Sequence, residues 1–232
     1  MMVGRRALRR VLPEKAALAL RREWLVRQVA TDRAYRESEV DLLPRFVHAG
    51  DVCWDIGANS GTYTIALSRL ASRVLAFEPV PHNFEILEKV IRRARLSNVS
   101  AAPLALSDVT GEARMTVPVE GFYGGYYIAA FDDRGGFSVA TSTIDNLIAS
   151  GSPEPDFIKC DVEGAEERVL SGARSLITRR RPIWLLETFR DGVIGMAQSL
   201  GYRTFVNLAD GTLEEVDRLR GSHRNYWLLP RQ

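Results

Sequence analysis

The residues from Cys53 to Leu70, CWDIGANSGTYTIALSRL, constrain the fold more than any other stretch of the chain. An apolar run ends in Asp55, two glycines follow it, and an amphipathic helical pattern begins after them. A strand that turns tightly into a helix in this way is typical of open parallel α/β sheets, whose ligands bind beyond the carboxyl ends of the strands. The stretch therefore predicts both a fold class and the edge of the sheet where a ligand binds.

The rest of the chain repeats this alternation of strand and helix. Apolar strand patterns followed by helical patterns predict a parallel sheet that helices cover on both faces. We expect one domain in residues 50–232, preceded by a helical, basic cap in residues 1–49. A Gly- and Tyr-rich loop in residues 120–136 is expected to lie on the substrate side. One strand is predicted over residues 99–107 and one continuous helix over residues 165–177.

The composition is that of a soluble globular protein, with 46% hydrophobic and 26% charged residues. A net charge of +2 does not argue for nucleic acid or membrane as a partner, and we expect neither an acceptor of nucleic acid nor a membrane span. Residues 1–36 carry ten lysines and arginines against three acids. This segment could rest on an anionic surface such as a membrane face, or cap the domain as a solvated helix; its short apolar face favours the cap. The sequence leaves the oligomeric state open, and a homo-oligomer is compatible with it.

The two cysteines, Cys53 and Cys160, lie at positions of opposite parity in two neighbouring predicted strands. Their thiols should therefore point to opposite faces of the sheet. We expect no disulfide and a reducing, cytoplasmic location.

The turn DIGANSG narrows the choice of ligand. Gly57 allows a sharp turn, and Gly61 allows ligand and helix to approach closely. The spacing is neither the GxxxxGK[ST] of a phosphate-binding loop nor the GxGxxG of a dinucleotide site. Asp55 would repel a pyrophosphate but suits an amine, which favours S-adenosylmethionine over NAD. The alternatives are a nicotinamide-dependent oxidoreductase and a non-catalytic cofactor-binding protein.

Polar residues follow the next two predicted strands. Glu78 ends the second strand, 23 residues after Asp55, where an acid can accept both ribose hydroxyls of a nucleoside. The third strand ends in Ser107 and Asp108. These two residues could bind an adenine edge or simply initiate a turn, and the two interpretations weigh equally.

Charged residues crowd the ends of the fourth and fifth predicted strands. Lys159, Asp161 and Glu163 follow one strand, and Glu187 ends the next. Two carboxylates at neighbouring strand ends could serve as a general base and its orienting group, or could share a divalent cation such as Mg²⁺. We expect Asp161 to be the base, oriented by Lys159 or Glu187, and the sequence leaves the metal open.

Several of these blocks together resemble the FkbM family of S-adenosylmethionine-dependent methyltransferases. The resemblance runs from about residue 50 to residue 189 and includes WDIGANSGTYTIALSRL, VLAFEPVPHNFEIL, DFIKCDVEGAEERVLSGA and IWLLETF. It implies a class I methyltransferase fold, Rossmann-like and doubly wound, with a mostly parallel seven-stranded sheet that has one antiparallel strand. It also implies methyl transfer to a hydroxyl of a sugar, glycoside or polyketide-type natural product, without naming the acceptor.

The same resemblance implies roles for the residues at the strand ends. The methionine end of the cofactor would be lined by Asp55, Gly57, Asn59 and Gly61. Glu78 would hold the ribose, and Ser107 and Asp108 the adenine. Asp161 and Glu163 would lie by the reacting centre.

Overall fold

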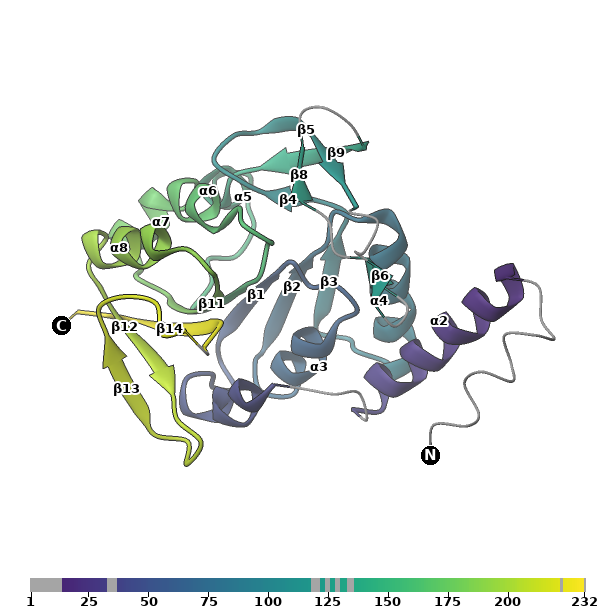
Figure 1. Ribbon diagram of the computed structural model, residues 1–232, viewed down its shortest axis with the longest axis horizontal. Helices are drawn as coiled ribbons and strands as arrows, with labels where there is room; N and C mark the ends of the chain where they lie inside the picture. Colours follow the sequence, from purple (N-terminus) through teal and green to yellow (C-terminus); the bar gives the residue numbers. More distant parts are fainter. Residues whose placement is uncertain are drawn as a thin grey trace.

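The computed structural model describes residues 14–32, 37–117, 122–123, 126–127, 130–132, 136–221 and 223–231. Its centre is one large sheet (Figure 1). The eight strands of this sheet are β1 (Val52–Ile56), β2 (Arg73–Phe77), β3 (Val99–Ala102), β10 (Phe157–Cys160), β11 (Ile183–Glu187), β12 (Tyr202–Asn207), β13 (Leu213–Val216) and β14 (Asn225–Pro230). Their order across the sheet is β13-β12-β14-β11-β10-β1-β2-β3.

The sheet is mixed and larger than predicted. The strands β3, β2, β1, β10 and β11 pair in parallel, whereas β14 is antiparallel to both β11 and β12, and β13 is antiparallel to β12. The predicted seven strands with one antiparallel strand are therefore wrong in number, since the sheet has eight strands and two of them run against the rest. The additional strand is β13, which follows a tight reversal at Asp210 and Gly211.

That reversal has a local cause. Gly211 has φ +79°, a conformation that glycine adopts without strain. The Asp210 carboxylate accepts a hydrogen bond from the Thr212 N–H at 2.9 Å, and Leu208 N–H donates to the Thr212 carbonyl at the same distance. The chain thus folds back so that Leu213 pairs with Asn207. An Asp-Gly pair between two strand-like runs is a known hairpin signal.

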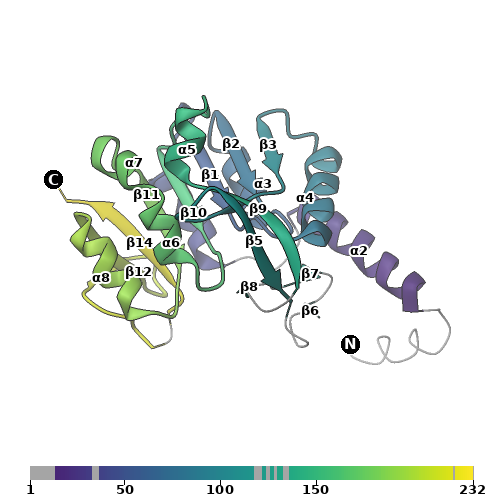
Figure 2. The same cartoon turned by 90° about the horizontal axis from the view of Figure 1, so that it is seen from above.

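Helices cover both faces of the large sheet. One face packs against α5 (Ile144–Ala149), α6 (Glu166–Ser171), α7 (Arg174–Arg179) and α8 (Asp191–Ser199). The other packs against the 3-10 helix η2 (Ser38–Arg45), α3 (Thr62–Ser68) and α4 (Pro81–Ala94), and α2 (Glu14–Ala30) packs on α3 and α4. Figure 2 shows α6 to α8 on one side and α2 and α4 on the other. None of the described helices is long and apolar enough to cross a membrane.

The two cysteines confirm the predicted parity. Cys53 belongs to the core between the sheet and α3, whereas Cys160 belongs to the core between the sheet and α6 to α8. Both thiols are free and buried.

The helix predicted over residues 165–177 is wrong, because the chain breaks into α6 and α7 at Gly172. A Cβ added at Gly172 would lie 2.1 Å from the carbonyl oxygen of Ser107, so the break brings the two backbones into contact. The Asp145 carboxylate then accepts hydrogen bonds from the N–H groups of Ser175 and Leu176 at 2.8 and 2.9 Å. These bonds satisfy donors that a new helix start leaves open.

A second, four-stranded sheet lies beside the large one. It contains β4 (Ala105–Leu106), β5 (Gly111–Thr116), β8 (Ala130–Phe131) and β9 (Phe137–Ser142), in the order β4-β9-β5-β8. The single strand predicted over residues 99–107 is divided between the two sheets, with Pro103 in the gap where no backbone donor is available. The predicted loop 120–136 falls largely outside the described residues, apart from β6 (Phe122–Tyr123), β7 (Tyr126–Tyr127), β8, Asp132 and Gly136, and its role stays a prediction.

Candidate functional site

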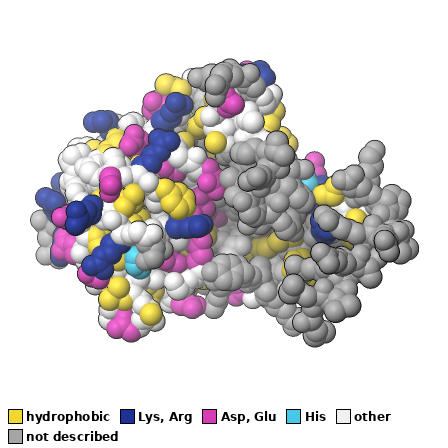
Figure 3. Space-filling model, in the orientation of Figure 1, with side chains coloured by type: hydrophobic (Ala, Val, Ile, Leu, Met, Phe, Trp, Pro, Cys, Tyr) yellow, Lys and Arg dark blue, Asp and Glu magenta, His cyan; other side chains and the backbone are white. Residues whose placement is uncertain are grey.

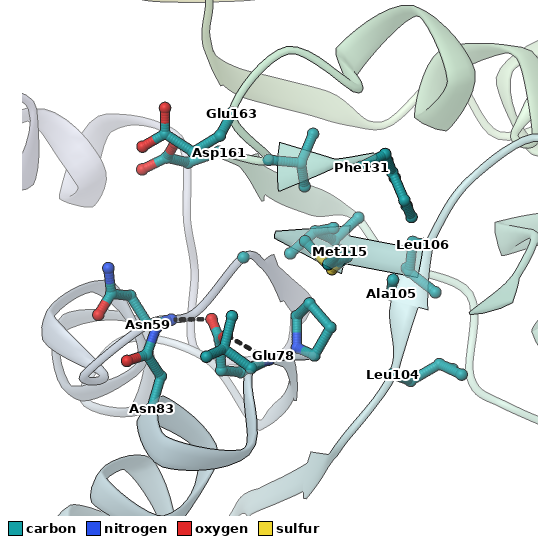
Figure 4. Close-up of a pocket in the computed structure, with 15 residues that line it drawn as sticks. Asn59, Glu78, Asn83, Leu104, Ala105, Leu106, Met115, Phe131, Asp161 and Glu163 are labelled. Carbon is teal, nitrogen blue, oxygen red and sulfur yellow. Dashed lines mark hydrogen bonds between the residues drawn. The ribbon is translucent and has the colours of Figure 1, made fainter. Parts of the chain in front are cut away.

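A pocket lies beyond the carboxyl ends of β1, β2 and β10, where the second sheet covers it (Figure 4). One part of its wall is acidic, with Glu78, Asp161 and Glu163. The opposite part is apolar and comes from residues 104–106, Met115 and Phe131 of the second sheet and its approach. A ligand with one charged end and one flat apolar end fits such a wall.

The turn after β1 forms the floor of the pocket, and its glycine is required by a neighbouring strand end. Gly57 has φ +79°, and a Cβ added there would lie 1.7 Å from the carbonyl oxygen of Asp161. The N–H groups of Gly57 and Ala58 both donate to the carbonyl of Phe77, at 2.9 and 3.0 Å. The turn is thus held between β2 and β10, and the predicted residues Gly57 and Asn59 line the pocket.

Asn59 carries an unused acceptor. Its backbone N–H donates to Glu78 at 2.8 Å, but its side-chain oxygen is buried and has no hydrogen-bond partner among the described residues. A buried polar atom without a partner costs free energy of about 1–3 kcal/mol. A ligand that donates a hydrogen bond, such as an amine, would remove that cost.

Glu78 lies in the pocket wall with both carboxylate oxygens anchored. One accepts the N–H of Asn59 and the other the N–H of Val80, each at 2.8 Å. Burial raises its pKa to about 7, and these hydrogen bonds oppose the rise. The carboxyl group is therefore oriented before any ligand arrives, with lone pairs left for hydroxyl donors. Asn83, at the start of α4, also lines the wall and was missed because its sequence context reads only as a helix start.

Asp55 and Gly61 do not line the pocket. Asp55 is 1% exposed and accepts a hydrogen bond from the Thr64 hydroxyl at 2.5 Å, and burial raises its pKa to about 6. A Cβ at Gly61 would lie 2.9 Å from a methyl carbon of Leu87, so this glycine allows α3 to pack on α4. Both residues contribute to the packing that holds the turn after β1 in place. The alternation of side chains along β1 could have predicted this, because Asp55 and Cys53 point to the same face of the sheet, away from the pocket.

Ser107 and Asp108 also lie apart from the pocket. Ser107 is 2% exposed and donates to the Asp108 carboxylate at 2.9 Å, in the manner of a turn. Asp108 borders a separate, shallow depression that contains Arg168 and Arg174. The apolar part of the pocket wall is instead formed just before them, by residues 104–106.

The predicted catalytic residues are together, around a buried lysine. Lys159 is 1% exposed, and its Nζ lies 4.0 Å from a carboxylate oxygen of Asp161 and 4.0 Å from one of Glu187. Burial alone would lower the pKa of Lys159, but Asp161 and Glu187 raise it above its usual value. The ammonium group therefore stays charged. In the view of Figure 3, acidic side chains gather near the middle of the molecule's visible surface.

Glu187 shows the effect of this crowding most strongly. Burial raises its pKa to about 8, the charge of Asp161 adds to the rise, and Lys159 opposes it. Glu187 therefore binds a proton more readily than an ordinary glutamate. Asp161 is partly exposed and lines the pocket.

Glu37, from the segment before β1, completes the cluster around Lys159. This residue was not predicted from the sequence as part of the site. Glu37 accepts hydrogen bonds from the Tyr63 hydroxyl at 2.7 Å and from the Asn225 amide at 2.8 Å. The Tyr63 ring lies 4.9 Å from the Lys159 Nζ, and Asn225 accepts from that Nζ at 3.4 Å. Nothing in the local pattern around Glu37 predicts this contact, since it joins residues far apart in the chain.

A positively charged side chain lies near the position where a shared divalent cation was predicted. Lys159 already places a positive charge near both Asp161 and Glu187. Within the described residues, no group of three or more His, Cys, Asp or Glu side chains is arranged to hold a metal ion. The geometry lends no support to Mg²⁺.

Comparisons with known proteins identify the family of this chain. Residues 55–204 match the Methyltransferase FkbM domain family. Hexuronic acid methyltransferase AglP from Haloferax volcanii is 31% identical over 150 residues, which cover 64% of this chain and 59% of AglP. The chain thus spans little more than half the length of this curated relative.

Solved structures show the same fold at low identity. A crystal structure of Methyltransferase FkbM from Methylobacillus flagellatus KT has a TM-score of 0.53 at 18% identity, covering 77% of this chain and 43% of that one. A Streptococcus mutans structure in complex with SAH has a TM-score of 0.50 at 12% identity, covering 85% and 99%. The class I methyltransferase fold and the family match over residues 55–204 lead to one conclusion: the chain belongs to the FkbM family of methyltransferases.

Proposed function

We propose that the chain is an S-adenosylmethionine-dependent O-methyltransferase whose acceptor is a hydroxyl of a sugar, a glycoside or a related natural product such as a polyketide. The observation that carries this proposal is the position of Asp161. Its side chain belongs both to the wall of the pocket and to the cluster around Lys159. A cofactor in the pocket and an acceptor at the cluster would therefore meet at one carboxylate.

The residues of the pocket fit this cofactor. The unpartnered oxygen of Asn59 and the carboxylates of Asp161 and Glu163 suit the ammonium and sulfonium charges, and Glu78 suits the ribose hydroxyls. The apolar wall at residues 104–106, with Met115, suits the adenine. When bound, S-adenosylmethionine supplies a methyl group on a positively charged sulfur that is already a good leaving group.

The chain's own residues then have two tasks. The first is to hold the acceptor oxygen in line, which can supply on the order of 7–11 kcal/mol of the barrier. The second is to accept the hydroxyl proton, which we assign to the Asp161 carboxylate and which typically contributes about 10²–10⁴-fold. We assign Lys159 and Glu187 as positioning residues, because the buried Lys159 Nζ lies 4.0 Å from a carboxylate oxygen of each acid and so links Glu187 to Asp161.

The sugar acceptor is supported by the likeness to AglP, which is a hexuronic acid methyltransferase by name. The aligned region is about three fifths of AglP, so this support extends to the class of acceptor only. We also propose a reducing, cytoplasmic location, because Cys53 and Cys160 are free thiols in separate parts of the core. The division into a cap over residues 1–49 and a domain over residues 50–232 is likewise a proposal.

A calorimetric titration in metal-free buffer tests the cofactor directly. We expect S-adenosylmethionine to bind and NAD⁺ not to bind. Transfer of labelled methyl groups to glycoside and polyketide hydroxyls would then separate an enzyme from a non-catalytic cofactor-binding protein. Binding of NAD⁺ without S-adenosylmethionine would overturn the proposal in favour of an oxidoreductase.

A further inference from the structure

An exposed aromatic ring and two arginines border the cluster around Lys159. Phe189 is 61% exposed, although it lies only two residues after Glu187. The guanidinium of Arg224 lies over its ring, 5.2 Å from the centroid. Arg190 follows Phe189 directly and is exposed. We call these three residues the rim platform.

The rim platform is fixed to the strands that carry the cluster. Glu187 and Asn225 are register partners in β11 and β14, and the Thr188 N–H donates to the Arg224 carbonyl at 2.9 Å. The Thr188 hydroxyl in turn accepts the Arg190 N–H at 3.2 Å. The platform is therefore a rigid continuation of the two strand ends beside the proposed reacting centre.

Both arginines face the acidic turn that lines the pocket. Burial raises the pKa of Glu163, and the charge of Arg224 opposes this rise, so the two groups are close enough to interact. An Nη atom of Arg190 lies 3.4 Å from where a Cβ on Gly164 would stand. Burial likewise raises the pKa of Glu166, and the charge of Arg190 opposes this rise. None of the ion pairs formed among the described residues includes either guanidinium, so both arginines act on these acids from beyond ion-pair distance. The charged side chains thus change from acidic at Asp161 and Glu163 to basic at Arg190 and Arg224.

This arrangement orients an acceptor with a matching charge distribution. One ring face of Phe189 is covered by Arg224, which leaves aromatic surface for the apolar face of a sugar ring. The unpaired guanidinium groups are bidentate donors suited to a carboxylate or a phosphate. The acidic wall on the other side repels the same anion, so a charged substituent would be held at the rim while a hydroxyl points to Asp161.

We infer that the rim platform binds an anionic sugar, in which a carboxylate or phosphate substituent contacts Arg224 and Arg190 and the ring stacks on Phe189. This inference rests on the proposed function, whose acceptor class it narrows.

The test measures binding of D-glucuronate, glucose 1-phosphate, D-glucose and the neutral methyl ester of glucuronic acid, with and without S-adenosylhomocysteine. We expect the anionic sugars to bind at least about tenfold tighter than glucose or the ester. The two anionic ligands show which anion the site prefers. Equal affinities for anionic and neutral sugars, or no binding of either anionic sugar, would overturn the inference.

Variants separate charge recognition from a general loss of structure. Arg224→Gln should weaken the binding of anionic sugars about tenfold while glucose is unaffected, and Arg224→Lys should restore part of the loss. Phe189→Ala should weaken the binding of all four sugars. Arg92→Gln, an equal change of charge at an exposed position of α4, is the control and should leave sugar binding unchanged. An Arg224→Gln protein that still prefers anionic sugars would also overturn the inference. Failure of S-adenosylmethionine to bind would count against the proposed function instead, because the sugars are also measured without cofactor.

Discussion

The α-carbon of Gly57 faces the carbonyl oxygen of Asp161 so closely that a Cβ on residue 57 would lie 1.7 Å from it. This contact joins the end of β1 to the end of β10, and so joins the floor of the pocket to the proposed base. The positive φ of Gly57 adds a second restriction, because other residues adopt that conformation only with strain.

The first prediction follows from this contact. Gly57→Ala should lower the free energy of unfolding by roughly 2 kcal/mol or more, from backbone strain and displacement of the Asp161 peptide. Urea unfolding measures the change. Gly195→Ala is the matched control: residue 195 lies inside α8 with nothing within 4 Å of an added Cβ, and alanine there should stabilise by about 0.5–1 kcal/mol. Similar losses in both variants would contradict the argument.

The second prediction concerns the pH dependence of stability. Burial raises the pKa of Asp55 to about 6, above its usual value of 3.8. The folded state thus holds a proton on Asp55 that the unfolded state releases. The stability contributed by this protonated carboxyl group is fully present below about pH 4 and is lost as pH rises through 6. Asp55→Asn removes the titration and keeps an oxygen for the Thr64 hydroxyl. The variant should gain on the order of 3 kcal/mol relative to the wild type between pH 4 and pH 7. Parallel stability curves for the two proteins would show that Asp55 does not titrate in this way.

The third prediction concerns Asp161. Asp161→Asn should lower kcat by about 10²–10⁴-fold with a much smaller effect on the Kd of S-adenosylmethionine, because the amide cannot accept the hydroxyl proton. Methyl-transfer assays and calorimetry give the two quantities. Asp217→Asn, at an exposed position, is the control. If turnover and cofactor affinity fell by the same factor, Asp161 would be a binding residue and not the base.

The fourth prediction is the reverse case. Glu78→Ala should weaken S-adenosylmethionine binding by roughly 10–100-fold, because the carboxylate proposed to accept the two ribose hydroxyls is lost and the N–H groups of Asn59 and Val80 lose their partner. At saturating cofactor, kcat should change far less. An unchanged Kd would mean that Glu78 does not hold the ribose.

The fifth prediction concerns metal. Chelation of divalent cations should leave methyl transfer unchanged, since Lys159 already supplies the positive charge between Asp161 and Glu187. The measurement is activity in EDTA, followed by addition of Mg²⁺. Activity that is lost with EDTA and restored by Mg²⁺ would assign the two carboxylates to a metal instead.

Much of the site was predictable from local pattern. The turn glycine Gly57, the acid Glu78 at the end of β2, and the charged trio of Lys159, Asp161 and Glu187 were all found from strand ends, and the structure brings each to the same edge. Their positions follow from a simple rule, because the carboxyl ends of parallel strands share one edge of a sheet. Their roles stay predictions until the variants above are measured.

Some of the residues assigned to the cofactor from the sequence do not line the pocket, for reasons that the structure shows. Asp55 was assigned to the ligand although strand parity turns it toward α3, where Thr64 binds it. Asp108 follows a strand that leaves the large sheet at Pro103 and enters the second sheet, so it borders the separate depression that also contains Arg168. The eighth strand, β13, was not predicted, although the Asp-Gly pair before it is a hairpin signal.

The sequence by itself determined the strand-turn-helix unit at residues 53–70, the α/β class and the family, because each depends on local periodicity and short spacings. Only the tertiary structure decided what surrounds Lys159 and what covers the pocket. Glu37 reaches the cluster from the cap, Met115 reaches the pocket from a second sheet, and Arg224 lies over Phe189. These contacts join residues far apart in the chain, and their geometry depends on how the packed elements meet and not on the pattern within any one of them.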